Sequence, residues 1–151
     1  MDEKAVKSQV PQSAAWLGGL GLLPFVALAA SLVLAPGDLK PTLAYALLGY
    51  GAVILSFLGG VHWGLAIGST APAAAESLKT RLILSVIPSL VAWAALLMPA
   101  GGLFVLAAAI ALMLIVDLRA TRAGHAPSWY PRLRIPLSFA VAVSLLAGAL
   151  L

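Results

Sequence analysis

The chain has 151 residues, of which 62% are hydrophobic and only 9% are charged, and its mean hydropathy is +1.07. A soluble domain carries roughly 25% charged residues, so this composition excludes both a water-soluble globular domain and a disordered chain. The length allows one domain. The absence of cysteine excludes disulfides, thiolate nucleophiles and cysteine-ligated metals. The composition therefore predicts an integral membrane protein.

Long stretches without charged residues mark the expected membrane spans. The charge-free run 82–116 is too long for one span of ~20 residues, and the turn signal Pro99-Ala100-Gly101-Gly102 divides it in two. All the stretches are continuously apolar, whereas the strands of a membrane barrel would alternate, so the expected fold is an all-α bundle of five transmembrane helices. The expected helices cover residues 14–35, 43–67, 82–98, 103–119 and 134–151.

The basic residues between these spans predict the orientation of the chain. Residues 1–13 are expected to form a cytoplasmic tail, followed by a single transmembrane domain, 14–151. The tail and the loops after the second and fourth spans hold eight of the nine Lys and Arg residues, and the other side holds Lys40 alone. The positive-inside rule then places the N-terminus inside and the C-terminus outside. A cleaved signal peptide ending near Ala27-Leu28-Ala29 is the alternative for the first span, but its apolar stretch is longer than a usual signal sequence.

Small residues recur every four positions along the second span. They form a stripe of Ala52, Ser56, Gly60, Gly64 and Gly68 on one helical face. Such stripes let two helix backbones approach closely in lipid, where packing replaces the hydrophobic drive between helices. The stripe predicts that another helix packs against this face. That helix belongs either to the same chain or to a second protein, and the sequence leaves both open.

Two prolines lie deep within the expected spans. Pro24 and Pro88 fall in the first and third helices, at the half nearer the cytoplasm. Proline removes a backbone donor and leaves a carbonyl without its partner, so both residues are expected to kink their helices. They are either ordinary membrane-helix prolines or the cause of a partly hydrated cavity on the inner side.

Two ionisable residues lie at similar expected depth inside the membrane. His62 is in the second span, about 200° around the helix from the small-residue stripe, and Asp117 ends the fourth span. Polar groups in lipid are costly, so the two are expected to form a polar site, and a histidine beside a carboxylate makes a proton-linked step feasible. In the alternative interpretation, His62 only tethers two helices or donates to a backbone carbonyl. Asp117 would then form an interfacial salt bridge with Arg119, Arg122 or Arg81.

Aromatic and basic residues surround the start of the last span. The segment has the composition that is usual at a membrane interface, with Trp129, Tyr130, Arg132 and Arg134. A sharper hypothesis adds Arg81 and makes the set a site for an anionic head group or ligand, with the two aromatic rings as its wall.

Motifs that carry catalysis are absent from the sequence. It contains no glycine-rich phosphate loop, no HExxH and no GxSxG, and two isolated histidines are too few for a metal site. We therefore expect neither a cofactor nor a metal, and the missing motifs favour a protein that is not an enzyme. The basic residues are spread along a membrane face without any nucleic-acid-binding motif, so no nucleic-acid partner is expected.

Several of these residues together resemble one known family, the transmembrane protein 69-like family, also described as domain of unknown function 3429. The resemblance runs from about Trp16 onward and rests on Gly59-Gly60-Val61-His62-Trp63-Gly64, Ser85-Val86-Ile87-Pro88, Asp117, Pro127-Ser128-Trp129-Tyr130 and Leu133-Arg134. The family occurs in bacteria and in eukaryotes. The resemblance implies the membrane architecture and draws attention to His62, Trp63, Asp117, Trp129 and Tyr130, but it implies no reaction. An Ala/Leu-rich chain without an additional targeting segment favours a bacterial inner membrane.

Two functional hypotheses follow. In the first, the protein is a small transporter-like or ligand- and lipid-binding protein with a polar site on the cytoplasmic side, formed by His62 and Asp117. In the second, it is a non-catalytic structural or assembly factor that docks on a membrane partner through the small-residue stripe. The expected partners are the lipid bilayer, including anionic lipid, and either a second copy of the chain or another membrane protein.

Overall fold

The computed structural model describes residues 9–68, 75–98 and 101–151, and within these ranges all regular secondary structure is helical. Each of its five helices is long and apolar enough to cross a membrane, which confirms the predicted fold class. The expected tail, 1–13, lies mostly outside the described residues. The helices are α2 (Gln12–Leu34), α3 (Lys40–Ile67), α4 (Ala75–Leu96), α5 (Gly102–Arg122) and α6 (Tyr130–Leu150).

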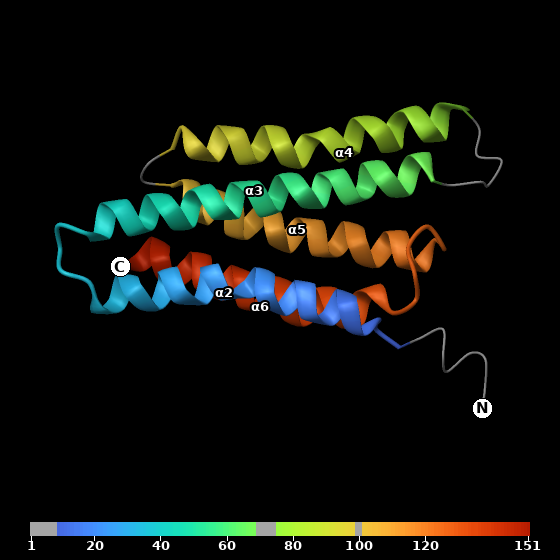
Figure 1. The fold of residues 1–151 in the computed structure, drawn as a ribbon. Coiled ribbons are helices and arrows are strands. Elements are labelled where there is room, and N and C mark those ends of the chain that lie inside the picture. The colour runs from blue at the N-terminus through green and yellow to red at the C-terminus, as the bar shows by residue number, and fades with distance from the viewer. Residues whose placement is uncertain (1–8, 69–74, 99–100) are drawn as a thin grey trace.

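The helices run alternately up and down in one bundle (Figure 1). The helix α3 contacts each of the other four, and the most extensive packing joins α3 to α4 and α5 to α6. The helix α2 packs against α3 and α6. At one end of the bundle α3 and α5 finish while α4 and α6 begin. This basic end carries Arg81, Arg119, Arg122, Arg132 and Arg134.

Two helices begin earlier than the charge-free stretches indicate. The helix α4 begins at Ala75 rather than near residue 82, and α6 begins at Tyr130 rather than at residue 134. The first two turns of both helices therefore contain basic residues. Lysine and arginine are tolerated there because their long stems lie along apolar surface while the charge reaches water. Pro131 also fits the first turn of α6, where its missing N–H has no helical partner to lose.

The bundle has a packed apolar interior and an apolar exterior. Large side chains from α2, α3, α5 and α6 fill the centre, while many other large apolar side chains on every helix point outward. An apolar outer surface is what a bilayer requires of a spanning bundle. The largest fully buried apolar side chains are Phe25, Leu32, Leu47, Leu55, Leu106, Ile110 and Leu145.

The helices α3 and α4 approach each other closely at Gly59. A Cβ atom on this residue would lie 2.5 Å from the carbonyl oxygen of Ser85 and 3.3 Å from the Cβ of Pro88. Contacts below 3.0 Å force the backbone or its neighbour to shift, so only glycine fits here. The absence of a side chain at Gly59 therefore allows α4 to lie against the half of α3 that carries His62.

The small-residue stripe lies mostly on another face of α3. Ala52 is buried in the bundle and Ser56 is half-buried, but Gly60 and Gly64 are exposed, and a Cβ on either would meet nothing within 4 Å. Gly68 follows the end of the helix, and a Cβ there would meet only the carbonyl oxygen of Gly64. The tight contact between α3 and α4 is thus at Gly59, one position before Gly60 of the stripe. The role of the stripe in packing stays a prediction.

Both prolines lie inside continuous helices. Pro24 is within α2 and Pro88 is within α4, where it is buried. Pro24 deprives the carbonyl of Leu20 of its helical donor. The neighbouring carbonyl, that of Gly21, accepts a hydrogen bond of 2.8 Å from the Tyr50 hydroxyl of α3, which joins the two helices at this depth. The expected kinks stay a prediction.

Candidate functional site

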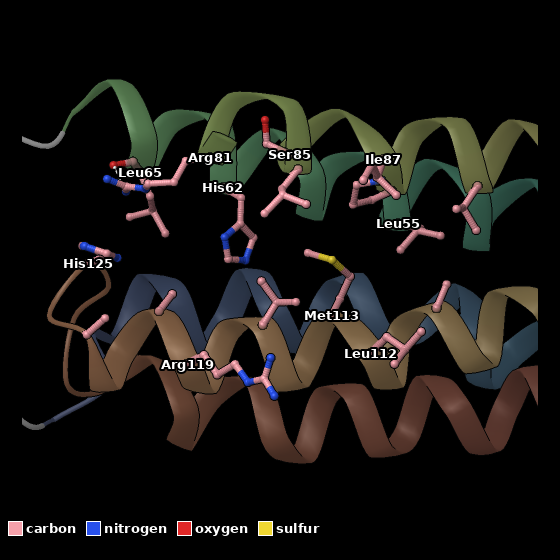
Figure 2. Close-up of a pocket in the computed structure, with 17 residues that line it drawn as sticks. Leu55, His62, Leu65, Arg81, Ser85, Ile87, Leu112, Met113, Arg119 and His125 are labelled. Carbon is pink, nitrogen blue, oxygen red and sulfur yellow. Dashed lines mark hydrogen bonds between the residues drawn. The ribbon is translucent and has the colours of Figure 1, made fainter. Parts of the chain in front are cut away.

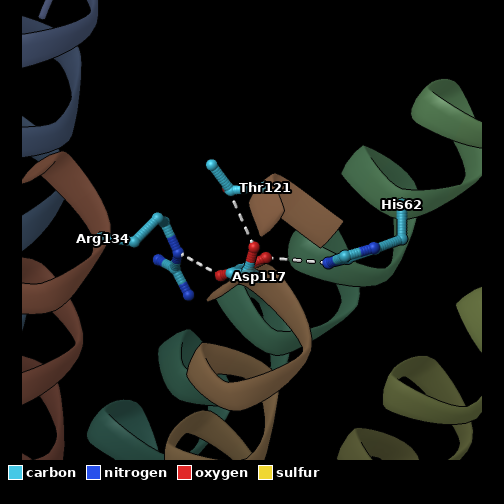
Figure 3. Close-up of polar contacts among 4 residues, drawn as sticks. All are labelled: His62, Asp117, Thr121 and Arg134. Carbon is cyan, nitrogen blue, oxygen red and sulfur yellow. Dashed lines mark hydrogen bonds and ion pairs between the residues drawn. The ribbon is translucent and has the colours of Figure 1, made fainter. Parts of the chain in front are cut away.

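The polar centre of the bundle is the carboxylate of Asp117, near the end of α5. Its side chain is fully buried, with 0% exposure. One oxygen, Oδ1, lies 2.7 Å from Nε2 of His62 on α3, and the other, Oδ2, accepts a hydrogen bond of 2.6 Å from Nε of Arg134 on α6 (Figure 3). We call these three residues the His–Asp–Arg cluster. It joins three helices at the basic end of the bundle.

The charges in this cluster explain how it is tolerated in an apolar interior. A buried carboxylate without a partner would be very costly, and the guanidinium of Arg134 supplies the opposite charge together with a hydrogen bond. An ionised carboxylate only accepts hydrogen bonds, so the proton of the His62–Asp117 bond belongs to Nε2. In the neutral ring, Nδ1 of His62 is then a hydrogen-bond acceptor. The cluster thus fixes both the tautomer and the orientation of the imidazole.

The turn between α5 and α6 places Arg134 beside Asp117. The Thr121 hydroxyl donates to the carbonyl of Asp117 at 3.0 Å in the last turn of α5. Gly124 then adopts a left-handed conformation, with φ of +76°, and the amide of His125 donates to the carbonyl of Ala120 at 2.9 Å. This is the usual hydrogen-bond pattern of a glycine-terminated helix. Because the turn is short, residues at similar distances from it on α5 and α6 face each other.

The structure brings together some of the residues singled out from the sequence and separates others. His62 and Asp117 lie in contact. Asp117 is not paired with Arg119, Arg122 or Arg81, the partners considered for a salt bridge, but with Arg134. This ion pair was not expected from the sequence, in which the composition around Arg134 indicated a head-group site. The signal that could have found it is the short α5–α6 turn, which sets the two residues at one depth.

The remaining head-group candidates occupy different places. Arg81 donates from Nη2 to the carbonyl of Leu65 at 2.9 Å, at the last turn of α3, where a cation is favourable. The rings of Trp129 and Tyr130 meet edge to face with centroids 6.0 Å apart, and the Tyr130 phenol interacts with the Asp117 carboxylate. Arg132 is exposed. Arg81 borders one cavity of the bundle and Arg134 borders another. The two arginines therefore do not form one joint site.

The first cavity, of about 430 Å³, lies between α3, α4 and α5. Figure 2 shows His62 of α3 and Met113 of α5 pointing into it from opposite sides. Its polar lining is at the basic end, where His62, Arg81, Arg119 and His125 border it. The rest of the lining is mainly apolar and includes Leu55, Leu84, Ile87, Pro88, Val91, Ala109, Leu112 and Val116.

The second cavity, of about 310 Å³, lies between α2, α3 and α6. Arg134 and Tyr130 border it at the basic end, and the rest of its lining is apolar, including Leu17, Phe25, Phe57, Val61 and Leu137. The two partners of Asp117 thus border different cavities, His62 the first and Arg134 the second. Within the described ranges, no group of three or more His, Asp or Glu side chains is placed to hold a metal ion.

These features define a polytopic, all-α membrane protein with a buried ion pair and two cavities at one end. The chain belongs to the family described as "Protein of unknown function (DUF3429)", whose model matches residues 10–150. This membership confirms the resemblance found in the sequence.

Two relatives carry the name Transmembrane protein 69. The protein of Xenopus tropicalis is 41% identical over 99% of this chain, and that of Mus musculus is 29% identical over 93% of it. The chain spans 58% and 57% of the lengths of these relatives. No solved structure matches the chain.

Proposed function

We propose that the protein is a small ligand-binding membrane protein, transporter-like in its architecture, whose first cavity takes an amphiphile with an anionic head group. The observation that carries the proposal is the polarity of this cavity: cationic and imidazole groups border one end, and apolar side chains border the rest. Its volume of about 430 Å³ falls in the range of small-molecule sites, roughly 300–1,000 Å³.

The charge balance favours an anion at the basic end of this cavity. Asp117 and Arg134 neutralise each other within the His–Asp–Arg cluster. Among the described residues that line this cavity none is acidic, so no carboxylate of the lining neutralises Arg81 or Arg119. The guanidinium of Arg81 uses one of its five N–H bonds on Leu65 and has further donors for a carboxylate or phosphate.

His62 lies where the polar end of the cavity meets the apolar part. Its Nε2 is bonded to Asp117, which leaves Nδ1 as the ring atom for a ligand. Protonation would turn Nδ1 into a donor and add a positive charge to the cavity. Anion binding and proton uptake would then favour each other, which is the physical basis for a proton-linked step.

The proposal includes the orientation and location derived from the sequence. The basic end faces the cytoplasm and the protein resides in a bacterial inner membrane, with its C-terminus outside. The positive-inside rule supports this orientation, because Lys40 is the single Lys or Arg residue of the sequence that falls at the opposite end. Five helices are few for a complete transporter, so a transport function would require the protein to oligomerise.

Native mass spectrometry of the full chain in detergent tests this proposal. The probes are dodecanoate and dodecanol, which share a tail and differ in the charge of the head group. The variants are His62→Leu, Ala109→Phe and Ala108→Phe. Ala109 borders the first cavity, whereas Ala108 is exposed and borders neither cavity, so the last variant is a matched control for added volume.

In the wild type we expect more of the dodecanoate adduct than of the dodecanol adduct. The dodecanoate adduct should weaken in His62→Leu and be lost in Ala109→Phe, but it should be kept in Ala108→Phe. Equal binding of both probes would refute the anionic head group. An adduct that survives Ala109→Phe would refute the location.

A second candidate function is a structural or assembly role through the small-residue stripe. The observation that favours it is the exposure of Gly60 and Gly64 on α3, where a Cβ would meet none of the described residues within 4 Å. A partner helix, in a second copy or another membrane protein, fits such a surface. Gly64→Leu should abolish co-purification of two differently tagged copies, whereas Gly19→Leu, on an equally open position of α2, should not. Unchanged co-purification of Gly64→Leu would count against self-association through the stripe.

A further inference from the structure

The second cavity is bordered by an arginine with an unsatisfied donor. Arg134 is only 8% exposed, and its Nε is bonded to Asp117. Its Nη2 atom is buried and has no hydrogen-bond partner in the part of the chain that the structure describes. Buried polar groups almost always have a partner, whether protein, water or ligand, because an unmade bond leaves the full cost of desolvation.

A second unsatisfied group lies one turn along the same face of α6. Ser138 is 3% exposed, and its hydroxyl also has no partner among the described residues. A serine inside a helix usually donates back to a carbonyl of the preceding turn, as Ser144 does to Ala140 at 2.9 Å. Ser138 does not border the second cavity, so Nη2 of Arg134 is the donor for which a molecule bound in this cavity would supply an acceptor.

The cavity itself selects the kind of molecule that would supply this acceptor. Apart from Arg134 and Tyr130, its lining is apolar, and it lies between α2, α3 and α6, sharing only α3 with the helices that form the first cavity. An apolar body is thus required, with one polar group at the basic end. This site is separate from the one in the proposed function and does not depend on it.

Charge decides the nature of the polar group. The guanidinium of Arg134 is already neutralised by Asp117, to which it is directly bonded. A second anion would bring an excess negative charge into a buried site, which is unfavourable in a medium of low dielectric constant. A carbonyl oxygen accepts hydrogen bonds without adding charge. We propose that the second cavity binds an uncharged, apolar molecule through a carbonyl oxygen that accepts from Nη2 of Arg134.

Two sources supply this chemistry in a membrane, the ester carbonyl of a lipid and the ring carbonyl of a quinone. The test is native mass spectrometry of the full chain with three probes. Dioctanoylglycerol carries ester carbonyls, 1,2-dioctylglycerol has ethers in their place, and a benzoquinone with a decyl tail carries ring carbonyls. Preference for the first or the third probe separates the two sources.

Four variants locate the site. Arg134→Lys keeps a positive charge beside Asp117 but removes the planar Nη2 donor. Leu137→Trp fills the second cavity without changing the cluster, and Ile135→Trp adds the same volume at an exposed position of α6 that borders neither cavity. Ala109→Phe fills the first cavity and leaves the three residues of the cluster unchanged. Circular dichroism of each variant checks that the helices are retained.

We expect one carbonyl probe to bind the wild type in preference to the ether. Its affinity should fall roughly 10- to 100-fold in Arg134→Lys, the loss of a hydrogen bond to a charged group, and be lost in Leu137→Trp. Ile135→Trp and Ala109→Phe should retain it. Equal binding of ester and ether, or an adduct that survives Leu137→Trp, overturns the proposal. So does the absence of any adduct with the three probes, since water would then satisfy Nη2.

Discussion

Replacing Asp117 with asparagine tests the His–Asp–Arg cluster most directly. The substitution preserves the shape of the side chain and removes its charge. The carboxylate accepts on both oxygens, from His62 at 2.7 Å and from Arg134 at 2.6 Å. An asparagine accepts on one oxygen only, so its NH₂ group opposes one of these two donors unless the imidazole adopts its other tautomer and accepts at Nε2. Arg134, which is 8% exposed, loses its counter-charge in either case.

The expected cost follows from this burial. Removing one partner of a buried ion pair typically destabilises a protein by about 3–5 kcal/mol, because the other charge is left uncompensated. Single hydrogen bonds between membrane helices contribute only about 0.6 kcal/mol on average. A loss in the higher range therefore identifies a charge effect, and a loss near the lower value identifies an ordinary hydrogen bond.

The free energy of unfolding is measured by titrating the protein from mild detergent into dodecyl sulfate and following helicity by circular dichroism. The exposed Asp38→Asn is the matched control and should change little. In the double variant Asp117→Asn/Arg134→Met the unpaired charge is gone, so it should be more stable than the sum of the two single losses predicts. A loss below about 1 kcal/mol in Asp117→Asn, or strict additivity in the double variant, would refute the reasoning.

Two further predictions concern helix packing and orientation. Gly59→Ala should lower the free energy of unfolding by about 1–3 kcal/mol, since a Cβ there meets the α4 backbone at 2.5 Å. In the same titration, the control Gly60→Ala should stay within about 0.5 kcal/mol of the wild type. Equal losses in the two variants would contradict the close approach at Gly59. Because the chain contains no cysteine, single-cysteine variants report orientation without background. A membrane-impermeant maleimide should label Asp38→Cys in intact cells and Ala123→Cys only after the membrane is opened, and the reverse pattern would overturn the proposed orientation.

The spans and the polar pair were accessible from the sequence for a simple physical reason. Charges are so costly in lipid that their absence outlines each helix, and those few that remain must find partners. His62 and Asp117 could therefore be paired from depth alone. Helix ends were less certain, because the basic residues Lys79 and Arg81 lie inside the first turns of α4 rather than before it.

The rotational setting of each helix could not be predicted. In a soluble bundle the polar face marks the outside, but here both the lipid-facing and the buried faces are apolar, so periodicity does not show which side points inward. For this reason the sequence indicated Gly60 as a helix-packing residue, whereas the tight contact between α3 and α4 is at Gly59. The same limitation hid the burial of Arg134, which interface composition alone assigned to the surface.

The placement of Asp117 between the two cavities has a thermodynamic consequence. One carboxylate holds His62 at the wall of the first cavity and Arg134 at the wall of the second. A molecule in either cavity that strengthens or loosens its neighbour's bond to Asp117 alters the bond on the other side. By reciprocity, the two occupants must then change each other's affinity by the same factor. A substitution that removes one of the two bonds to Asp117 should make the two binding affinities independent. Each cavity would still bind its molecule, but an occupant of one cavity would no longer change the affinity of the other.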